Sequence, residues 1–339
     1  MRAIQMVQQG GPEVLRLVEI PTPQPGPGEV LVRVEAAAVN FADIMRRRGD
    51  AYPIPTPSPF VLGAEVAGTV AAVGEGVDHL PIGVAVFGTV GADASGGYAE
   101  FAIASASNII PIPAGLEPDV AAGIVVAGLT ATMVLAEAAK VTDGDSVFVP
   151  AAAGGVGSYA VQIAKLLGSD NVIAAASTPA KRELALKLGA DHAVDYSADN
   201  WTQSVREITG GWGVDVALEM SGPASLSKTL GILAPFGRLV VYGAVSGITD
   251  ELDRAALLRL LYDPQPNQTL TAFNLGLWFQ YRMQAAVACL ERLVGWIASG
   301  QLVTPPVHAL PLAEAAEAHR LLETGATTGK VVLKPWSLR

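Results

Sequence analysis

The residues with the clearest capacity for chemistry lie around a glycine-rich turn near the middle of the chain. An apolar segment at 146–150 leads into Ala151-Ala-Ala-Gly-Gly-Val-Gly157, where a helix is expected to begin. Backbone N–H groups at such a turn, together with the positive end of the helix dipole, bind a pyrophosphate. We expect the binding groups to come from Ala153, Gly154, Gly155, Val156 and Gly157. Because Ala152 replaces the first glycine of the usual pattern, a turn without a ligand stays an alternative.

The residues after this turn predict which dinucleotide binds. At about 20 residues beyond the turn, a protein that binds NAD places an acidic side chain on the ribose hydroxyls. Ser177 and Thr178 stand there instead, and a hydroxyl can donate to a 2′-phosphate that a carboxylate would repel. Lys181 and Arg182 open the next helix, and Tyr196 ends the third strand. The pattern favours NADPH, although the two cations can also form a solvated helix face with Tyr196 capping the sheet edge.

An alternation of strands and helices must position these residues. Strands are expected at 146–150, 171–177, 193–196, 214–221, 237–243 and 269–273, and helices at 156–168, 179–189, 201–209, 224–233 and 252–262. This order predicts a doubly wound parallel sheet, the Rossmann arrangement. The first third of the chain is β-rich instead, with expected strands at 4–7, 30–36 and 65–73. The tail predicts a long helix from 282 to about 300 and a closing strand at 329–333.

Composition narrows the classes of partner. The chain has 339 residues and a net charge of −10, which disfavours nucleic acid and anionic membranes as partners. The uncharged segment 120–136 is 17 residues long and rich in Gly and Ala, so we expect a buried helix rather than a membrane span. Cys289 is the single cysteine, which excludes an internal disulfide. We expect a cytoplasmic protein without a signal peptide.

Short motifs along the whole chain resemble the medium-chain dehydrogenase/reductase superfamily and, within it, the zinc-free quinone oxidoreductases. The matching motifs occupy residues 10–15, 38–45, 63–68, 127–131, 151–157, 188–191 and 328–333. The resemblance implies an α/β protein with a GroES-like, β-rich catalytic domain over 1–126, completed by 275–339. It also implies an NADPH-binding Rossmann domain over 127–274, and a homodimer paired through the strand near 269–273.

The resemblance also assigns cofactor-binding residues. Lys181 and Tyr196 match positions that hold the adenosine 2′-phosphate, and Thr130 matches a position beside the nicotinamide. The remaining cofactor wall is expected to include Gly243, Phe273, Asn274 and Lys330. After the Gly-Leu-Thr motif, residues 131–133 are smaller than in many relatives. These smaller side chains either widen the substrate pocket or only change the packing of the core.

The same comparison indicates a metal-free site. Zinc alcohol dehydrogenases of this superfamily have a Cys at the position of Asn40 and a His at the position of Ala64. Glu65 alone remains, and catalytic zinc needs three protein ligands. The histidines lie in no ligand-like spacing and are expected at the surface: His79, His192, His308 and His319.

Without a Lewis acid, the acceptor must take hydride readily, as a quinone or an α,β-unsaturated carbonyl does. Asn40 and Asp43 match positions that face the nicotinamide in relatives. Asn40 can donate to the carbonyl oxygen or can cap a helix. Tyr52 can protonate the product or form an apolar lid. The leading hypothesis is an NADPH-dependent quinone or enone reductase. One alternative is an enoyl-thioester reductase. The other is a protein that binds NADPH without catalysis, as crystallin-like members of the family do.

Overall fold

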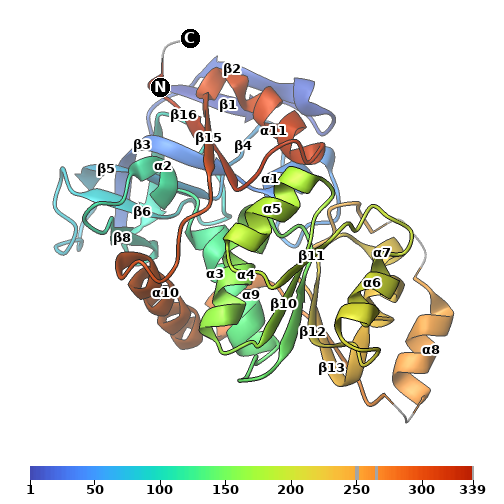
Figure 1. Cartoon of the computed structure of the whole chain (residues 1–339). Coiled ribbons are helices and arrows are strands. Elements are labelled where there is room, and N and C mark those ends of the chain that lie inside the picture. The colour runs from blue at the N-terminus through green and yellow to red at the C-terminus, as the bar shows by residue number, and fades with distance from the viewer. Residues whose placement is uncertain (249–251, 264–265, 338–339) are drawn as a thin grey trace. The chain divides into compact units, whose positions relative to one another are not determined.

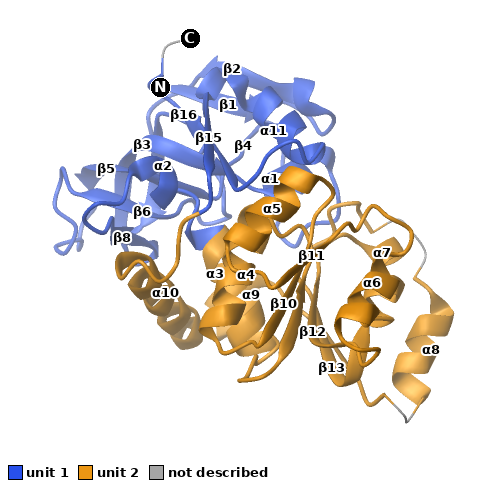
Figure 2. Cartoon of the chain, in the orientation of Figure 1, with its two compact units in different colours: residues 1–126, 305–339 blue, residues 127–304 orange. Residues whose placement is uncertain are grey.

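The computed structural model describes residues 1–248, 252–263 and 266–337, and the chain forms two compact units (Figure 2). Unit 1 contains residues 1–126 and 305–339, and unit 2 contains residues 127–304. Residues 275–304, which we expected to complete the first domain, therefore belong to unit 2. The reason is packing: Gln162 exchanges two hydrogen bonds with the Val303 backbone, and Leu293 packs against Gly128.

Unit 1 is built mainly on antiparallel strand pairs, with one parallel pair at the edge of its larger sheet. One sheet has the order β2-β1-β4, and the larger one has the order β15-β16-β3-β5-β6-β8, with β7 also paired to β3. The strands are β1 (Arg2–Met6), β2 (Leu15–Glu19), β3 (Glu29–Val39), β4 (Phe60–Val61), β5 (Glu65–Val73), β6 (Ala85–Thr89), β7 (Phe101–Ser105), β8 (Ile109–Pro111), β15 (Val307–Pro311) and β16 (Lys330–Lys334). The β-rich character predicted for the first third is confirmed. Its core is a cluster of buried valines, leucines and isoleucines from these strands.

In the described part of unit 1, three α-helices accompany the strands: α1 (Phe41–Arg48), α2 (Pro118–Ala121) and α11 (Ala315–Glu323). Asn40, directly after β3, is the N-cap of helix α1, and Gly49, whose φ of 82° suits glycine, is its C-cap. The Asp43 carboxylate accepts the backbone N–H of Asn40, as the third residue of a capping box does. This helix start therefore places two predicted site residues together.

Unit 2 is a six-stranded parallel sheet with the order β11-β10-β9-β12-β13-β14. Its strands are β9 (Ser146–Val149), β10 (Asn171–Ala175), β11 (His192–Val194), β12 (Val214–Glu219), β13 (Leu233–Val241) and β14 (Thr269–Ala272). The predicted doubly wound sheet is confirmed. The order reverses between β9 and β12, and ligands of such sheets bind at the carboxyl ends of strands at this point.

The helices of unit 2 lie on both faces of this sheet (Figure 1). They are α3 (Val125–Met133), α4 (Gly155–Leu166), α5 (Pro179–Lys187), α6 (Trp201–Ile208), α7 (Pro223–Leu230), α8 (Arg254–Tyr262), α9 (Leu275–Tyr281) and α10 (Met283–Ala298). In Figure 1, α4 and α5 lie on one side of the strands and α6 and α7 on the other. The bounds of α4 to α8 differ by a few residues from the expected helices, because helix ends fray.

The segment 120–136 is buried as expected but is not one helix. It contains the end of α2, a turn, α3 and the start of a π-helical turn at Val134–Ala138. Residues 131–133 are fully buried, which favours core packing over a wider substrate pocket. Among residues 1–248, 252–263 and 266–337, no helix has both the length and the apolar character needed to cross a bilayer.

Candidate active site

A buried polar cluster in unit 1 surrounds Asn40. The Lys330 ammonium donates to Asn40 Oδ1 at 2.7 Å, to Glu65 Oε1 at 3.1 Å and to the Val39 carbonyl at 3.5 Å. Asn40 Nδ2 donates to Glu65 Oε1 at 3.0 Å, and the Val126 N–H donates to Glu65 Oε2 at 2.7 Å. The exposed fractions of Asn40, Glu65 and Lys330 are 6%, 0% and 5%. These bonds fix the orientation of the Asn40 amide, with Oδ1 facing the Lys330 ammonium.

Strand pairing places Lys330 in this cluster. Strand β16 runs antiparallel to β3 with Val331 opposite Val39, so Lys330 comes next to Asn40 at the end of the ladder. We expected Lys330 to bind the cofactor. An ammonium has three N–H donors, and here three protein acceptors in unit 1 receive them. Its position indicates a residue that orients Asn40.

Asp43 lies beside this cluster at the start of α1. Its carboxylate accepts the Asn40 N–H at 2.9 Å, the Gly63 N–H at 3.0 Å and the Tyr98 hydroxyl at 3.2 Å. Burial raises the Asp43 pKa to about 6, and these donors and the Lys330 ammonium lower it from what burial alone would give. Asp43 thus changes charge near neutral pH while it holds the backbone of Asn40.

Tyr52 is half-buried in the proline-rich loop, and Arg46 holds that loop. The Arg46 guanidinium donates to Thr56 Oγ1 and to the carbonyls of residues 93 and 94, each at 2.9 Å. The Tyr52 ring lies 5.3 Å from the Arg46 guanidinium carbon. Burial, and after it the nearby Asp43 carboxylate, raise the Tyr52 pKa, so the hydroxyl keeps its proton. Arg46 is 2% exposed, and our sequence reasoning missed it.

One of the four histidines is buried, although all four were expected at the surface. His79, His192 and His308 are exposed as predicted, but His319 has an exposed fraction of 0%. Its Nε2 lies 3.1 Å from the Tyr98 hydroxyl, and its Nδ1 lies 3.4 Å from Arg47 Nη1. Burial, and after it the Arg47 charge, lower the His319 pKa to about 3, so the ring is neutral. The repeating apolar residues of α11 were the signal that one face of this helix is buried.

The glycine-rich turn has the geometry that the sequence predicted. Gly154 is the N-cap of α4, five residues after the end of β9, and lies at the carboxyl edge of the sheet where the strand order reverses. A Cβ at Gly157 would lie 2.2 Å from the Ala151 carbonyl oxygen and 2.7 Å from Ala152 Cα, so only glycine fits. Ala153 is buried next to this turn, and the first-turn N–H groups at 155–157 have no partner inside the helix.

The residues predicted for the 2′-phosphate follow β10 and β11. Because these strands pair in parallel, their carboxyl ends lie at one edge of the sheet. Ser177 is half-buried, and burial lowers the pKa of the half-buried Lys181. Tyr196 is 40% exposed after β11. Arg182 pairs with Asp195 at 2.8 Å and donates to the Ala176 carbonyl at 3.0 Å.

The other predicted cofactor residues are spread over unit 2. Gly243 follows β13, and Phe273 and Asn274 follow β14, at the carboxyl edge that also carries the glycine turn. Phe273 stacks on Trp278 with ring centroids 6.1 Å apart, and Asn274 caps α9. Thr130 is 7% exposed within α3.

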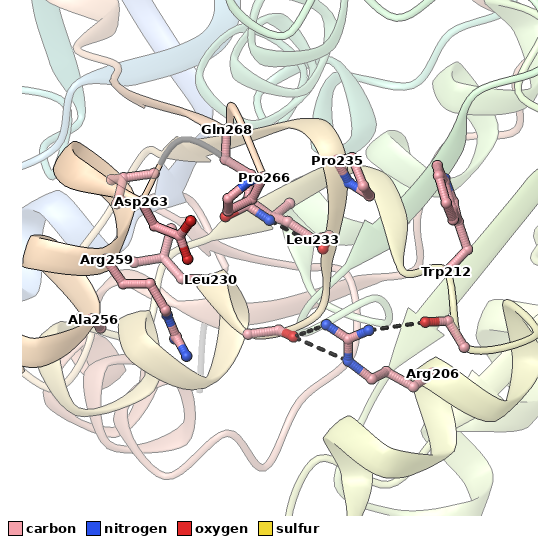
Figure 3. A pocket seen from close by; sticks show the side chains of 13 residues that line it. Arg206, Trp212, Leu230, Leu233, Pro235, Ala256, Arg259, Asp263, Pro266 and Gln268 are labelled. Carbon is pink, nitrogen blue, oxygen red and sulfur yellow. Dashed lines mark hydrogen bonds between the residues drawn. The ribbon is translucent and has the colours of Figure 1, made fainter.

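A cavity of about 450 Å³ in unit 2 lies at the opposite, amino-terminal edge of this sheet (Figure 3). Trp212, Leu233 and Gln268, which line it, stand at or just before the starts of β12, β13 and β14. The Arg206 guanidinium in its wall donates to the carbonyls of Gly211 and Gly231 (Figure 3). This cavity contains none of the predicted site residues.

Comparison with known proteins agrees with this architecture. Residues 26–114 match the family model described as the alcohol dehydrogenase GroES-like domain, and residues 155–290 match the model described as zinc-binding dehydrogenase. A 2-haloacrylate reductase of Burkholderia is 34% identical over 97% of this chain and 97% of its own length. A quinone oxidoreductase of Pseudomonas aeruginosa is 34% identical over 98% of this chain and 99% of its own length.

Solved structures give the same result. Quinone oxidoreductase of Escherichia coli, complexed with NADPH, has a TM-score of 0.89 and 31% identity, and the match covers 99% of this chain and 100% of that one. A mycobacterial protein complexed with NADPH has a TM-score of 0.89 and 38% identity, with coverage of 99% and 100%. The chain therefore belongs to the medium-chain dehydrogenase/reductase superfamily, as a quinone oxidoreductase-like member.

Proposed function

We propose that this protein is an NADPH-dependent reductase that transfers hydride to a quinone or an α,β-unsaturated carbonyl without a metal. The observation that carries the proposal is the fixed Asn40 amide. Its oxygen faces the Lys330 ammonium at 2.7 Å, and one N–H of Nδ2 bonds Glu65 at 3.0 Å. The second N–H of Nδ2 is then the group that donates to a substrate carbonyl.

NADPH fits the residues of unit 2. The first-turn amides of α4 are the groups that would bind the pyrophosphate, and this turn requires glycine at 157. After β10 the chain offers Ser177, Thr178 and Lys181 in place of a carboxylate, which suits a 2′-phosphate. When bound, NADPH supplies the hydride. Relatives that are similar along the whole chain were solved with NADPH, which supports this assignment.

Zinc does not fit the residues of unit 1. An ammonium, Lys330, already bonds both Asn40 and Glu65, and a divalent cation at these groups would meet a like charge. In the part of the chain that the structure describes, no group of three or more His, Cys, Asp or Glu side chains is placed to hold a metal ion. We therefore assign the polarising role to the Asn40 amide instead of a Lewis acid.

The reaction also needs a proton, because hydride addition leaves an enolate or a hydroquinone anion. Asn40 stabilises the oxygen as its negative charge grows. Tyr52, which keeps its proton because burial raises its pKa, is our candidate donor. One hydride and one proton together give the saturated carbonyl or the hydroquinone, and NADP⁺ leaves.

An enoyl thioester as acceptor and a purely NADPH-binding role are less favoured, because the relatives matched along nearly their whole length include a haloacrylate reductase and a quinone oxidoreductase. A homodimer remains a prediction: β14 ends the described sheet order and offers its edge to a second copy. Light scattering tests this prediction. A cytoplasmic location also stays a prediction, which cell fractionation tests.

The assay follows NADPH absorbance with 1,4-benzoquinone and, in parallel, with 2-alkenals. We expect turnover with one of these acceptors, and Asn40→Ala should lower kcat by about 10²-fold. Absence of NADPH consumption with every acceptor at high enzyme concentration would refute the proposal. An Asn40→Ala variant with normal kcat would remove the assigned role of the amide.

The cofactor assignment has its own test. Lys181→Ala should weaken NADPH binding by about 10- to 100-fold, as expected for one charge-assisted bond, and leave NADH binding unchanged. Lys187→Ala is the matched control, because this lysine stands at the far end of the same helix and pairs with Glu183 at the surface. Equal effects of the two variants on NADPH binding would overturn the phosphate assignment.

A further inference from the structure

Four buried side chains of unit 1 form a continuous chain of hydrogen bonds that ends at the Asn40 site. Arg47, His319, Tyr98 and Asp43 have exposed fractions of 1%, 0%, 0% and 1%. Arg47 Nη1 lies 3.4 Å from His319 Nδ1, His319 Nε2 lies 3.1 Å from the Tyr98 hydroxyl, and that hydroxyl lies 3.2 Å from Asp43 Oδ2. Burial of so many polar groups requires that each be satisfied.

The chemistry of the two ends fixes the direction of these bonds. A guanidinium can only donate, so His319 Nδ1 accepts from Arg47 and the ring proton sits on Nε2. Nε2–H then donates to the Tyr98 oxygen, and the Tyr98 hydroxyl donates to the Asp43 carboxylate. Arg47 is itself held by the Glu323 carboxylate and the Gly10 carbonyl. Every donor therefore points from the arginine toward Asp43.

The chain reaches Asn40 through one oxygen atom. Asp43 Oδ2 accepts both the Tyr98 hydroxyl and the Asn40 backbone N–H, the latter at 2.9 Å. The charged groups facing Asp43 include Lys330 on β16, and Tyr52 also feels the charge of this carboxylate. A change at Tyr98 therefore acts on the atom that holds the backbone of Asn40.

We propose that His319 is a positioning residue for the Asn40 site, which directs the Tyr98 proton at Asp43 and so keeps that carboxylate bonded to Asn40. The inference rests on the function proposed for Asn40. An apolar residue of similar volume would fill the same space. It would leave the Tyr98 oxygen without the N–H that polarises its hydroxyl, and so weaken the bond from that hydroxyl to Asp43.

Variants separate this role from simple packing. Glutamine at 319 offers an N–H to Tyr98 and an oxygen to Arg47, whereas leucine offers neither. We expect His319→Leu and Tyr98→Phe to lower kcat by about five- to tenfold with an unchanged KM for NADPH. The acid-side midpoint of kcat should move upward by roughly half to one pH unit, because the hydrogen bond to ionised Asp43 is lost in Tyr98→Phe and weakened in His319→Leu. His319→Gln should stay within about twofold of the wild type.

Two results would overturn the inference. One is a His319→Leu variant whose pH profile matches the wild type. The other is a His319→Gln variant that loses as much kcat as His319→Leu although its thermal unfolding is unchanged.

A readout without turnover separates this inference from the proposed function. In protein labelled with ¹⁵N-histidine, the His319 signal, assigned by its loss in His319→Gln, should show neutral imidazole protonated on Nε2 between about pH 5 and pH 8. A ring protonated on Nδ1, or one that titrates in this range, overturns the inference even if the enzyme is active. The expected tautomer in a protein that turns over no acceptor supports the hydrogen-bond chain and refutes the proposed function alone.

Discussion

Replacing Lys330 by methionine removes one buried charge and keeps the apolar stem of the side chain. The ammonium loses its bonds to Asn40, Glu65 and the Val39 carbonyl. Glu65 then keeps donors from Asn40 and Val126 but has no cation, and the side-chain exposures of the pair are only 6% and 1%. Removing one partner of a buried ion pair costs about 3–5 kcal/mol in the free energy of unfolding.

The measurement is urea unfolding of the whole protein at neutral pH. Lys334→Met is the matched control, because it lies on the same strand but is 27% exposed and pairs with Asp119 at the surface. We expect less than about 1 kcal/mol for this control. Adding Glu65→Gln to Lys330→Met should recover roughly half of the loss, since the uncompensated carboxylate is then gone.

Turnover measurements show whether Lys330 orients the Asn40 amide or binds the cofactor. Without the ammonium, the Asn40 amide can rotate, so Lys330→Met should lower kcat by about tenfold and leave NADPH affinity within about twofold. The buried ion pair does not stabilise the protein as described if Lys330→Met is no more destabilising than Lys334→Met, or if the double variant recovers nothing. A Lys330→Met variant that folds normally and no longer binds NADPH would restore Lys330 to the cofactor site.

Two further predictions concern the glycine turn and Asp43. Gly157→Ala should lose about 1–3 kcal/mol of stability and most NADPH affinity, because its Cβ would lie 2.2 Å from a carbonyl oxygen. Gly295→Ala, in open space on α10, should be neutral or stabilising in the same calorimetric and titration measurements. Burial raises the Asp43 pKa from 3.8 to about 6, so its ionisation costs about 3 kcal/mol at pH 7, a cost that disappears as the pH falls through 6 toward 4. In urea unfolding, wild-type stability should therefore rise relative to Asp43→Asn over this window, and parallel curves for the two proteins would contradict the shift.

Local signals in the sequence were sufficient for most of unit 2. The periodicity of apolar residues, which depends only on residues close in the sequence, distinguishes strands from helices. The strands β9 to β14 and the helices α4 to α8 therefore lie close to the expected ranges. The requirement for glycine at 157 is equally local, since the clashing atoms belong to Ala151 and Ala152. The assignment of residues 275–304 failed because it depends on packing against α3 and α4 within unit 2, which no local pattern reports.

The sequence by itself determined the fold class, the glycine turn and the candidates Asn40, Asp43 and Tyr52. Only the tertiary structure decided what holds Asn40. Lys330 is 290 positions from Asn40, and His319 is 221 positions from Tyr98. The antiparallel register of β16 on β3 brings the lysine to the amide, and the buried face of α11 brings the histidine to the tyrosine. Burial then makes these polar groups bond to one another, because water is no longer available to them.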